Sequence, residues 1–297
     1  TLAQVPDSIY HQRLYHLCKI WGFVKYHHSE IANGNVNWDD ELINRIPGIK
    51  SAPNNQAFND SLLLFINSAG ETSIGEGEIP EVPDSLNLIK DWTWMSDEVL
   101  SMEVQDKLNY IKEQFRPMLH VKIGQDSISK KTIFKDHGYN NISYYPEEEV
   151  RALALYRYWN CINYYFPYKL IMDKKWDTTL VESIPNIIQA ANKDEYHLAI
   201  KELSVKINDS HSYMESAVYR RIRGIIYTTF STKYIDGQMV VDKVLEIEEN
   251  IKFGDIVLEV DNVNTQLLRD SLLRYASGSN NISVETDLSN ILLWGQE

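Results

Sequence analysis

The chain contains an internal repeat. When residues 17–54 are aligned with residues 155–192, an offset of 138, 11 of the 38 positions are identical without a gap. Unrelated sequences of ordinary composition would share about two or three. The identical pairs are Leu17/Leu155, Trp21/Trp159, Tyr26/Tyr164, Trp38/Trp176, Asp39/Asp177, Leu42/Leu180, Ile46/Ile184, Pro47/Pro185, Ile49/Ile187, Ala52/Ala190 and Asn54/Asn192. Self-similarity of this size indicates a duplicated module, and it constrains the fold more than any other feature.

Each copy shows three runs of apolar residues at helical spacing. The first runs cover residues 14–24 and 153–164, and the third cover 58–66 and 196–207. The second runs follow capping-type residues at Trp38-Asp39-Asp40 and Trp176-Asp177-Thr178. We expect these second helices to be broken or bent near Pro47 and Pro185. The module is therefore predicted to be a small three-helix unit.

The composition and the spacing of apolar residues change twice outside the repeat. Residues 70–140 are rich in Gly, Pro and polar residues, which indicates a partly ordered linker region. Within it we expect one helix from Ser96 to about Phe115 and a short strand at 119–123. Strand-like runs follow at 225–230, 239–244 and 256–260, and a helix begins at Thr265. We predict an α+β chain with a first helical repeat at 1–69, the linker region at 70–140, a second helical repeat at 141–221 and a β-rich domain at 222–297.

Charge and composition narrow the function. Lys plus Arg is 29 and Asp plus Glu is 42, a formal net charge of −13 that disfavours nucleic acid and anionic lipid as partners. No uncharged apolar run approaches the ~20 residues of a membrane-spanning helix. The first residues resemble a trimmed or mature end, from which an export signal would already have been removed. The two cysteines, Cys18 and Cys161, favour buried free thiols, with a single bridge as the alternative.

Three groups of residues could carry chemistry. Adjacent histidines at 27 and 28, with Glu30 nearby, form a weak metal hypothesis, and an aromatic-like structural role is the favoured interpretation because the second copy has Tyr165 and Phe166 there. Asp209-Ser210-His211 is either catalytic or a turn lock, and the turn is favoured because no nucleophile accompanies it. The four repeat tryptophans could stack on sugars, but duplicated core positions are the simpler explanation. No metal site and no cofactor are expected.

A resemblance becomes visible at the end of the second copy. Tyr158-Trp159-Asn160, Tyr164-Tyr165-Phe166-Pro167-Tyr168 and Ile207-Asn208-Asp209-Ser210-His211-Ser212 resemble the helical N-terminal region of tail-specific, or C-terminal-processing, serine peptidases. In that family a Leu-x-Asp-Gly-His-Thr-like motif closes the helical region, so Asp209 and His211 match it and Ser210 stands at its Gly. Residues 238–244 and 253–261, which include Gly254-Asp255-Ile256, are similar to the strands of the PDZ-like domain that comes next in the family.

The resemblance implies that peptide binding and catalysis lie in separate domains. The family's Ser nucleophile and Lys base lie in a catalytic domain after the PDZ-like domain, so no catalytic residue is assigned in this chain, and the chain alone is expected to be inactive. A PDZ-like domain binds peptide by strand addition beside a helix. Its carboxylate loop would contain Gly224, Ile225 and Ile226, and the groove helix would contribute Leu267, Leu268 and Ser271.

We therefore expect the non-catalytic N-terminal portion of an exported serine endopeptidase, serving as scaffold and positioning a peptide substrate. Its partners would be a polypeptide substrate and the downstream catalytic domain of the same protein, in a periplasmic, outer-membrane-associated or secreted setting. The alternative is a stand-alone extracellular module in which the Trp-bearing units bind a glycan or another protein.

Overall fold

A computed structural model describes residues 7–72, 91–115, 120–129, 132–136, 138, 143–214, 216–224, 228–246 and 250–293. Helices dominate, accompanied by small antiparallel sheets, so the expected α+β class is confirmed. The chain divides into two compact units. The first unit comprises Thr1–Leu170 with Trp176–Ile188, and the second comprises Ile171–Lys175 with Gln189–Glu297. The domain boundaries expected from the sequence stay predictions.

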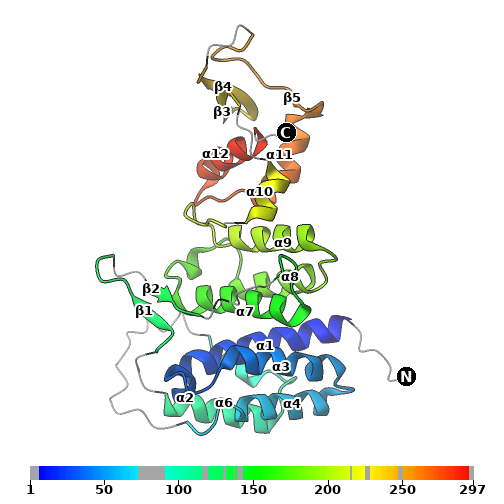
Figure 1. Cartoon of the computed structure of the whole chain (residues 1–297), viewed down its shortest axis with the longest axis vertical. Helices are drawn as coiled ribbons and strands as arrows, with labels where there is room; N and C mark the ends of the chain where they lie inside the picture. The colour runs from blue at the N-terminus through cyan, green and yellow to red at the C-terminus, as the bar shows by residue number, and fades with distance from the viewer. Residues whose placement is uncertain are drawn as a thin grey trace. The chain divides into compact units, whose positions relative to one another are not determined.

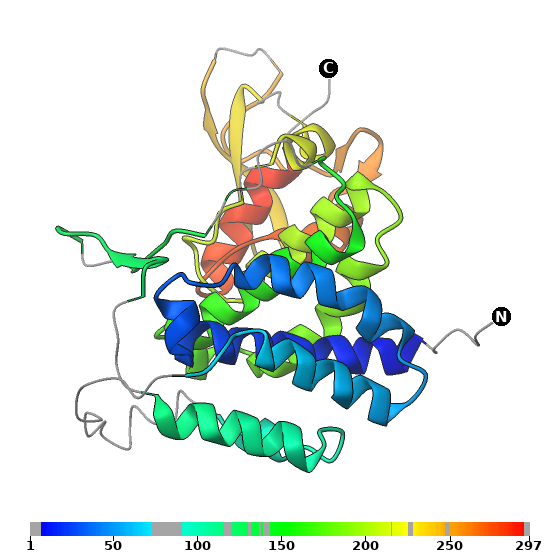
Figure 2. The same cartoon turned by 60° about the horizontal axis from the view of Figure 1, so that its bottom comes forward.

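The first unit is a helical bundle built around its N-terminal helix. Helix α1 contacts α3, α4, α6, α7 and α8 (Figure 1), and α4 and α6 lie side by side (Figure 2). The bundle contains α1 (Asp7–His27), α2 (Ser29–Ala32), α3 (Trp38–Ser51), α4 (Asn55–Asn67), η1 (Thr93–Ser96), α6 (Met102–Gln114), α7 (Glu148–Tyr165) and α8 (Trp176–Ile188), with η2 (Lys169–Ile171) between the last two. A hairpin of β1 (Ile123–Gln125) and β2 (Thr132–Phe134) precedes α7.

Two prolines leave their helices uninterrupted. Pro47 lies inside α3 and Pro185 inside α8, and both helices continue beyond them to Ser51 and Ile188. Of the two outcomes expected at these positions, a break or a bend, the break is therefore wrong. A proline removes one backbone donor, and the helix continues here because packing compensates: Ile49 and Ile187, on the C-terminal side of each proline, are fully buried.

Equivalent tryptophans make the same pair of hydrogen bonds at two places. In the first copy the indole Nε1 of Trp21 donates to the carbonyl of Trp38, and that of Trp38 donates to the carbonyl of Trp21, at 3.3 and 2.9 Å. Trp159 and Trp176 do the same at 3.0 and 2.9 Å. All four side chains are at most 4% exposed. These rings are core, so they offer no platform for a glycan.

Helices α1 and α7 run parallel and in register. Tyr10 donates to Glu148 at 2.5 Å near their N-terminal ends, and the rings of Tyr26 and Tyr164 lie 5.1 Å apart near their C-terminal ends. Between these contacts, a Cβ on Gly22 would come within 1.8 Å of Asn160 Oδ1. Each of these pairs is separated by the same 138 residues that relate the two copies. The two helices therefore approach closely at Gly22, where a larger side chain would clash with Asn160.

Two ion pairs are exchanged between the copies. The ammonium of Lys19 in α1 lies 2.6 Å from Asp177 in α8, and the guanidinium of Arg157 in α7 lies 2.5 Å from Asp39 in α3. Lys19 and Arg157 occupy equivalent positions, as do Asp39 and Asp177. Each copy thus supplies a cation to one pair and an anion to the other.

The second unit begins with α9 (Lys193–Val205) and α10 (Ala217–Arg223) and continues into strands. Strands β3 (Phe230–Ile235) and β4 (Gln238–Val244) form a hairpin whose turn residues Asp236 and Gly237 have φ of 49° and 77°, the left-handed values of a type I′ turn. A second small hairpin joins β5 (Glu259–Val260) to β6 (Val263–Asn264). Helix α11 (Thr265–Leu272), η3 (Leu273–Tyr275) and α12 (Asn281–Leu292) follow.

The core of the second unit lies between α12 and the first hairpin. Met239, Leu288, Ile291 and neighbouring apolar residues are buried there, and Phe230 and Tyr234 of β3 pack against them. Helix α12 contacts β3 directly. The strands expected at 239–244 and the helix expected from Thr265 are therefore confirmed. The strand expected at 225–230 begins at Phe230 within the described residues, and residues 225–227 lie outside them.

Candidate functional site

The motif Asp209-Ser210-His211 forms a locked turn. The Asp209 carboxylate accepts from the backbone amide of His211 at 2.8 Å and contacts its ring Nδ1 at 3.0 Å. The His211 side chain is 95% exposed. The hydroxyls of Ser210 and Ser279 lie 3.1 Å apart, and each accepts from the other residue's amide. These bonds give the motif a structural role, joining the turn to the segment before α12.

Gly224 ends helix α10. It is buried with φ of 100°, a value that favours glycine, and its amide donates to the carbonyl of Arg220 at 2.9 Å. Its backbone N–H is therefore already used. Ile225 and Ile226, the other residues expected in a carboxylate loop, lie outside the described residues.

The expected groove helix is α11, and its three candidate residues differ. Leu268 packs against the core that also holds Phe230 and Tyr234 of β3. Leu267 is 65% exposed, and exposed Ser271 donates to the carbonyl of Leu268. The structure thus brings Leu268 into the same cluster as β3, whereas the helix that lies directly against the strand is α12.

Strand β3 forms an edge of its sheet. Among the described strands it pairs only with β4, while the opposite side of β4 pairs with residues 254–257 through Gly254 to Val241, Val241 to Asp255 and Val257 to Met239. Because antiparallel pairs alternate, Thr232 and Tyr234, which lie opposite Val241 and Met239, direct their backbone groups to the other side of β3. That side is a candidate for strand addition.

A cavity of about 600 Å³ lies in the second unit. Lys201 of α9, Arg220 of α10, Tyr213, Ser277 and the first turns of α12 line it. Lys201 is only 6% exposed, and its ammonium donates to the hydroxyl of Ser277 at 3.2 Å. Sequence reasoning missed this cavity. The signal in the sequence was Lys201, a charged residue within the apolar helical run at 196–207.

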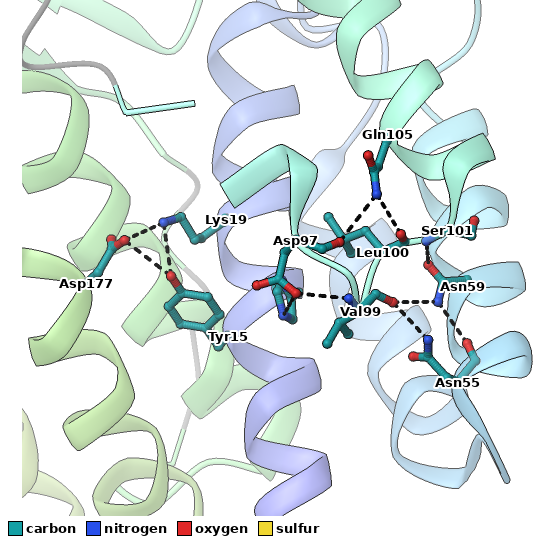
Figure 3. Close-up of polar contacts among 11 residues, drawn as sticks. Tyr15, Lys19, Asn55, Asn59, Asp97, Val99, Leu100, Ser101, Gln105 and Asp177 are labelled. Atoms are coloured by element: carbon teal, nitrogen blue, oxygen red, sulfur yellow. Dashed lines mark hydrogen bonds and ion pairs between the residues drawn. The ribbon is translucent and has the colours of Figure 1, made fainter. Parts of the chain in front are cut away.

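The first unit also gathers polar side chains, and these are structural. The Asn59 amide donates to the carbonyl of Val99, and its oxygen accepts from the amide of Ser101, which fixes the segment before α6 (Figure 3). His16 Nε2 lies 3.9 Å from Asp97. His27 stacks on Phe23 with centroids 4.8 Å apart, the aromatic-like role expected for it.

Burial of His16 predicts acid sensitivity. Desolvation lowers the pKa of His16 to about 4, with Asp97 raising it and Lys19 lowering it. In the unfolded chain the His16 imidazole takes up a proton below its ordinary pKa of 6.5, whereas in the folded chain it stays neutral until the pH approaches 4. The free energy of unfolding is therefore highest above pH 6.5 and decreases as the pH falls towards 4. We expect His16 to lower the free energy of unfolding by about 2 kcal/mol at pH 5. Urea unfolding at pH 7 and pH 5 should show a smaller loss for His16→Gln, and equal losses would contradict the prediction.

Both cysteines are free thiols, as favoured from the sequence, but only Cys18 is buried and Cys161 is half-buried. Among the described residues, no group of three or more His, Cys, Asp and Glu side chains could hold a metal ion. No helix in the described ranges is long and apolar enough to cross a membrane.

Comparisons of the chain with protein families, with curated proteins and with solved structures each find no match.

Proposed function

We propose that this chain is the non-catalytic N-terminal portion of an exported serine endopeptidase, acting as scaffold and holding an extended peptide for a catalytic domain that follows it in the same protein. The setting proposed is the periplasm, the outer membrane or the exterior. The side of β3 that no described strand pairs with carries the proposal, because the backbone groups of Thr232 and Tyr234 directed there can pair with a peptide strand.

The order of elements supports a PDZ-like second unit. A turn closed by Asp209 comes first, then the β3–β4 hairpin, then the segment after Gly254-Asp255 that bridges to β4 at Ile256, and then α11. This is the order that the resemblance to tail-specific peptidases implies. Gly254 has φ of 89° and donates to Val241, so this glycine serves the turn that returns the chain to β4.

The contacts of the first unit support a duplicated helical domain as the scaffold. The tryptophan pairs are equivalent, α1 and α7 run parallel in register, and the two ion pairs are exchanged. An interface of this kind, in which residue i contacts j and j contacts i, is characteristic of two-fold-related copies. The glycan-binding alternative loses its proposed surface, since the repeat tryptophans are buried.

A peptide titration tests the proposal. An extended pentapeptide with an apolar C-terminal residue, added to the isotope-labelled chain, is expected to shift the amide signals of β3 and of Leu267, Leu268 and Ser271. Affinity should be weak, about tens of micromolar, because the peptide loses conformational freedom on binding.

The control is the same peptide with alternate amides N-methylated, which cannot add to a strand and should leave the spectrum unchanged. If millimolar unmodified peptide causes no shift in β3, peptide holding by this strand is refuted.

A further inference from the structure

We propose that the cavity of the second unit binds the C-terminal carboxylate of the peptide, through Lys201, Arg220 and the N-terminus of α12. This inference rests on the proposed function and assigns the carboxylate to a different place from the glycine loop. A cavity of about 600 Å³ is within the ~300–1,000 Å³ of ordinary ligand pockets, so it has room for a short peptide end.

The glycine loop is poorly suited to the task. A carboxylate bound by backbone needs amides that point at it, and the Gly224 amide instead donates to the Arg220 carbonyl within the chain. That bond caps α10, so freeing the amide would unravel the end of the helix. The Gly224 amide is therefore not offered to a carboxylate, and the cavity provides other donors.

The cavity supplies cationic donors. Lys201 lies at its wall, 6% exposed, with its ammonium 3.2 Å from the Ser277 hydroxyl and 5.7 Å from the ring centre of Tyr219. Arg220 lines the same cavity and is exposed. Hydrogen bonds from cationic donors to a carboxylate are stronger than neutral ones, particularly where water is partly excluded.

One carboxylate also lines the cavity. Asp287 accepts from the backbone amide of Ser277 at 2.7 Å, so one of its oxygens is already engaged. Among the described residues that line the cavity, Lys201 and Arg220 are basic and Asp287 is acidic. A carboxylate bound there would meet cationic donors from two helices.

The N-terminus of α12 adds to this preference. Asn280 and Ser283 form a capping box, in which the Asn280 side chain accepts from the Ser283 amide. Asn280, Ile282 and Ser283 all line the cavity. The first-turn amides of a 12-residue helix and its dipole favour a negative group at this end.

Apolar side chains complete the site. Met214, Ile282 and Ile291 line the cavity together with the rings of Tyr213 and Tyr219. They can accommodate the side chain of the last residue of the peptide. The ligand is thus a peptide end with an apolar last residue and a free carboxylate.

The test compares a labelled pentapeptide ending in leucine with the same peptide as its C-terminal amide, using the full chain. We expect the amide to bind at least tenfold more weakly, because it loses charge-assisted hydrogen bonds. Arg220→Gln should weaken the acid about five- to tenfold and leave the amide unchanged. Arg221→Gln is the matched control, since Arg221 is exposed, pairs with Asp194 and does not line the cavity. It should bind like the parent chain.

The other outcomes separate the two proposals. Equal affinity for acid and amide, or shifts in β3 without shifts at Ser277, Ile282 and Ser283, overturns the carboxylate site and leaves the proposed function standing. No binding of either peptide at millimolar concentration overturns the proposed function and this inference with it. Acetate or phosphate binding as tightly as the acid peptide overturns the assignment to a peptide end, because the site would then serve a free small anion.

Discussion

Replacing Trp159 with alanine is expected to lower the free energy of unfolding by about 3–5 kcal/mol, the cost of truncating a large buried aromatic residue. Trp159 is fully buried in α7, and its ring stacks on that of Trp176 with an interplanar angle of 7°. Truncation also removes the hydrogen bond from the indole to the Trp176 carbonyl.

Denaturant unfolding followed by circular dichroism measures this loss without depending on the fluorescence of the deleted residue. Tyr168→Ala is the control, since Tyr168 is 60% exposed and its loss should cost under about 0.5 kcal/mol. A loss below about 1 kcal/mol for Trp159→Ala would mean that the ring does not pack in the core.

Arg157→Met should cost about 3 kcal/mol. The partner Asp39 is only 2% exposed, so removal of the guanidinium leaves a buried carboxylate without its ion-pair partner. The double variant Asp39→Leu/Arg157→Met should recover most of the loss, because an apolar pair of similar volume avoids the desolvation of both charges.

The equivalent pair in the other copy supplies the matched control. Lys19→Met leaves Asp177, which is 39% exposed and can be hydrated, so this change should cost under about 1 kcal/mol. Urea unfolding of the four proteins at pH 7 measures both effects. Equal losses for Arg157→Met and Lys19→Met would contradict an explanation based on burial of the remaining carboxylate.

The helices were predictable because their periodicity is strong and duplicated. Leu17, Trp21 and Leu42 are spaced as core residues, and all three are buried. The break expected at Pro47 failed because local propensity does not include the packing of the following turn. The strands were harder to bound. Ile256 is joined to Val240 by a single bridge, and β5 has two residues. Segments this short do not show the alternation of apolar and polar residues that identifies a strand.

The candidate site was less predictable than the fold. Lys201 and Ser277 are 76 residues apart and meet only through the folding of the second unit. The sequence placed a glycine at 224, where a left-handed conformation is indeed needed, but the reason is the end of α10. A glycine in the sequence indicates that the backbone needs an unusual conformation there. The sequence does not show which hydrogen bond the amide of that glycine makes.

Peptide addition to β3 is tested most directly by hydrogen exchange of four neighbouring amides with and without a saturating pentapeptide. Thr232 and Tyr234 direct their amides to the side of β3 away from β4, whereas Lys233 and Ile235 direct theirs to β4 and serve as internal controls. We expect peptide to slow exchange at Thr232 and Tyr234 at least tenfold and to change Lys233 and Ile235 little. Protection of Thr232 and Tyr234 that is already high without peptide, or unchanged by it, would contradict strand addition at this edge.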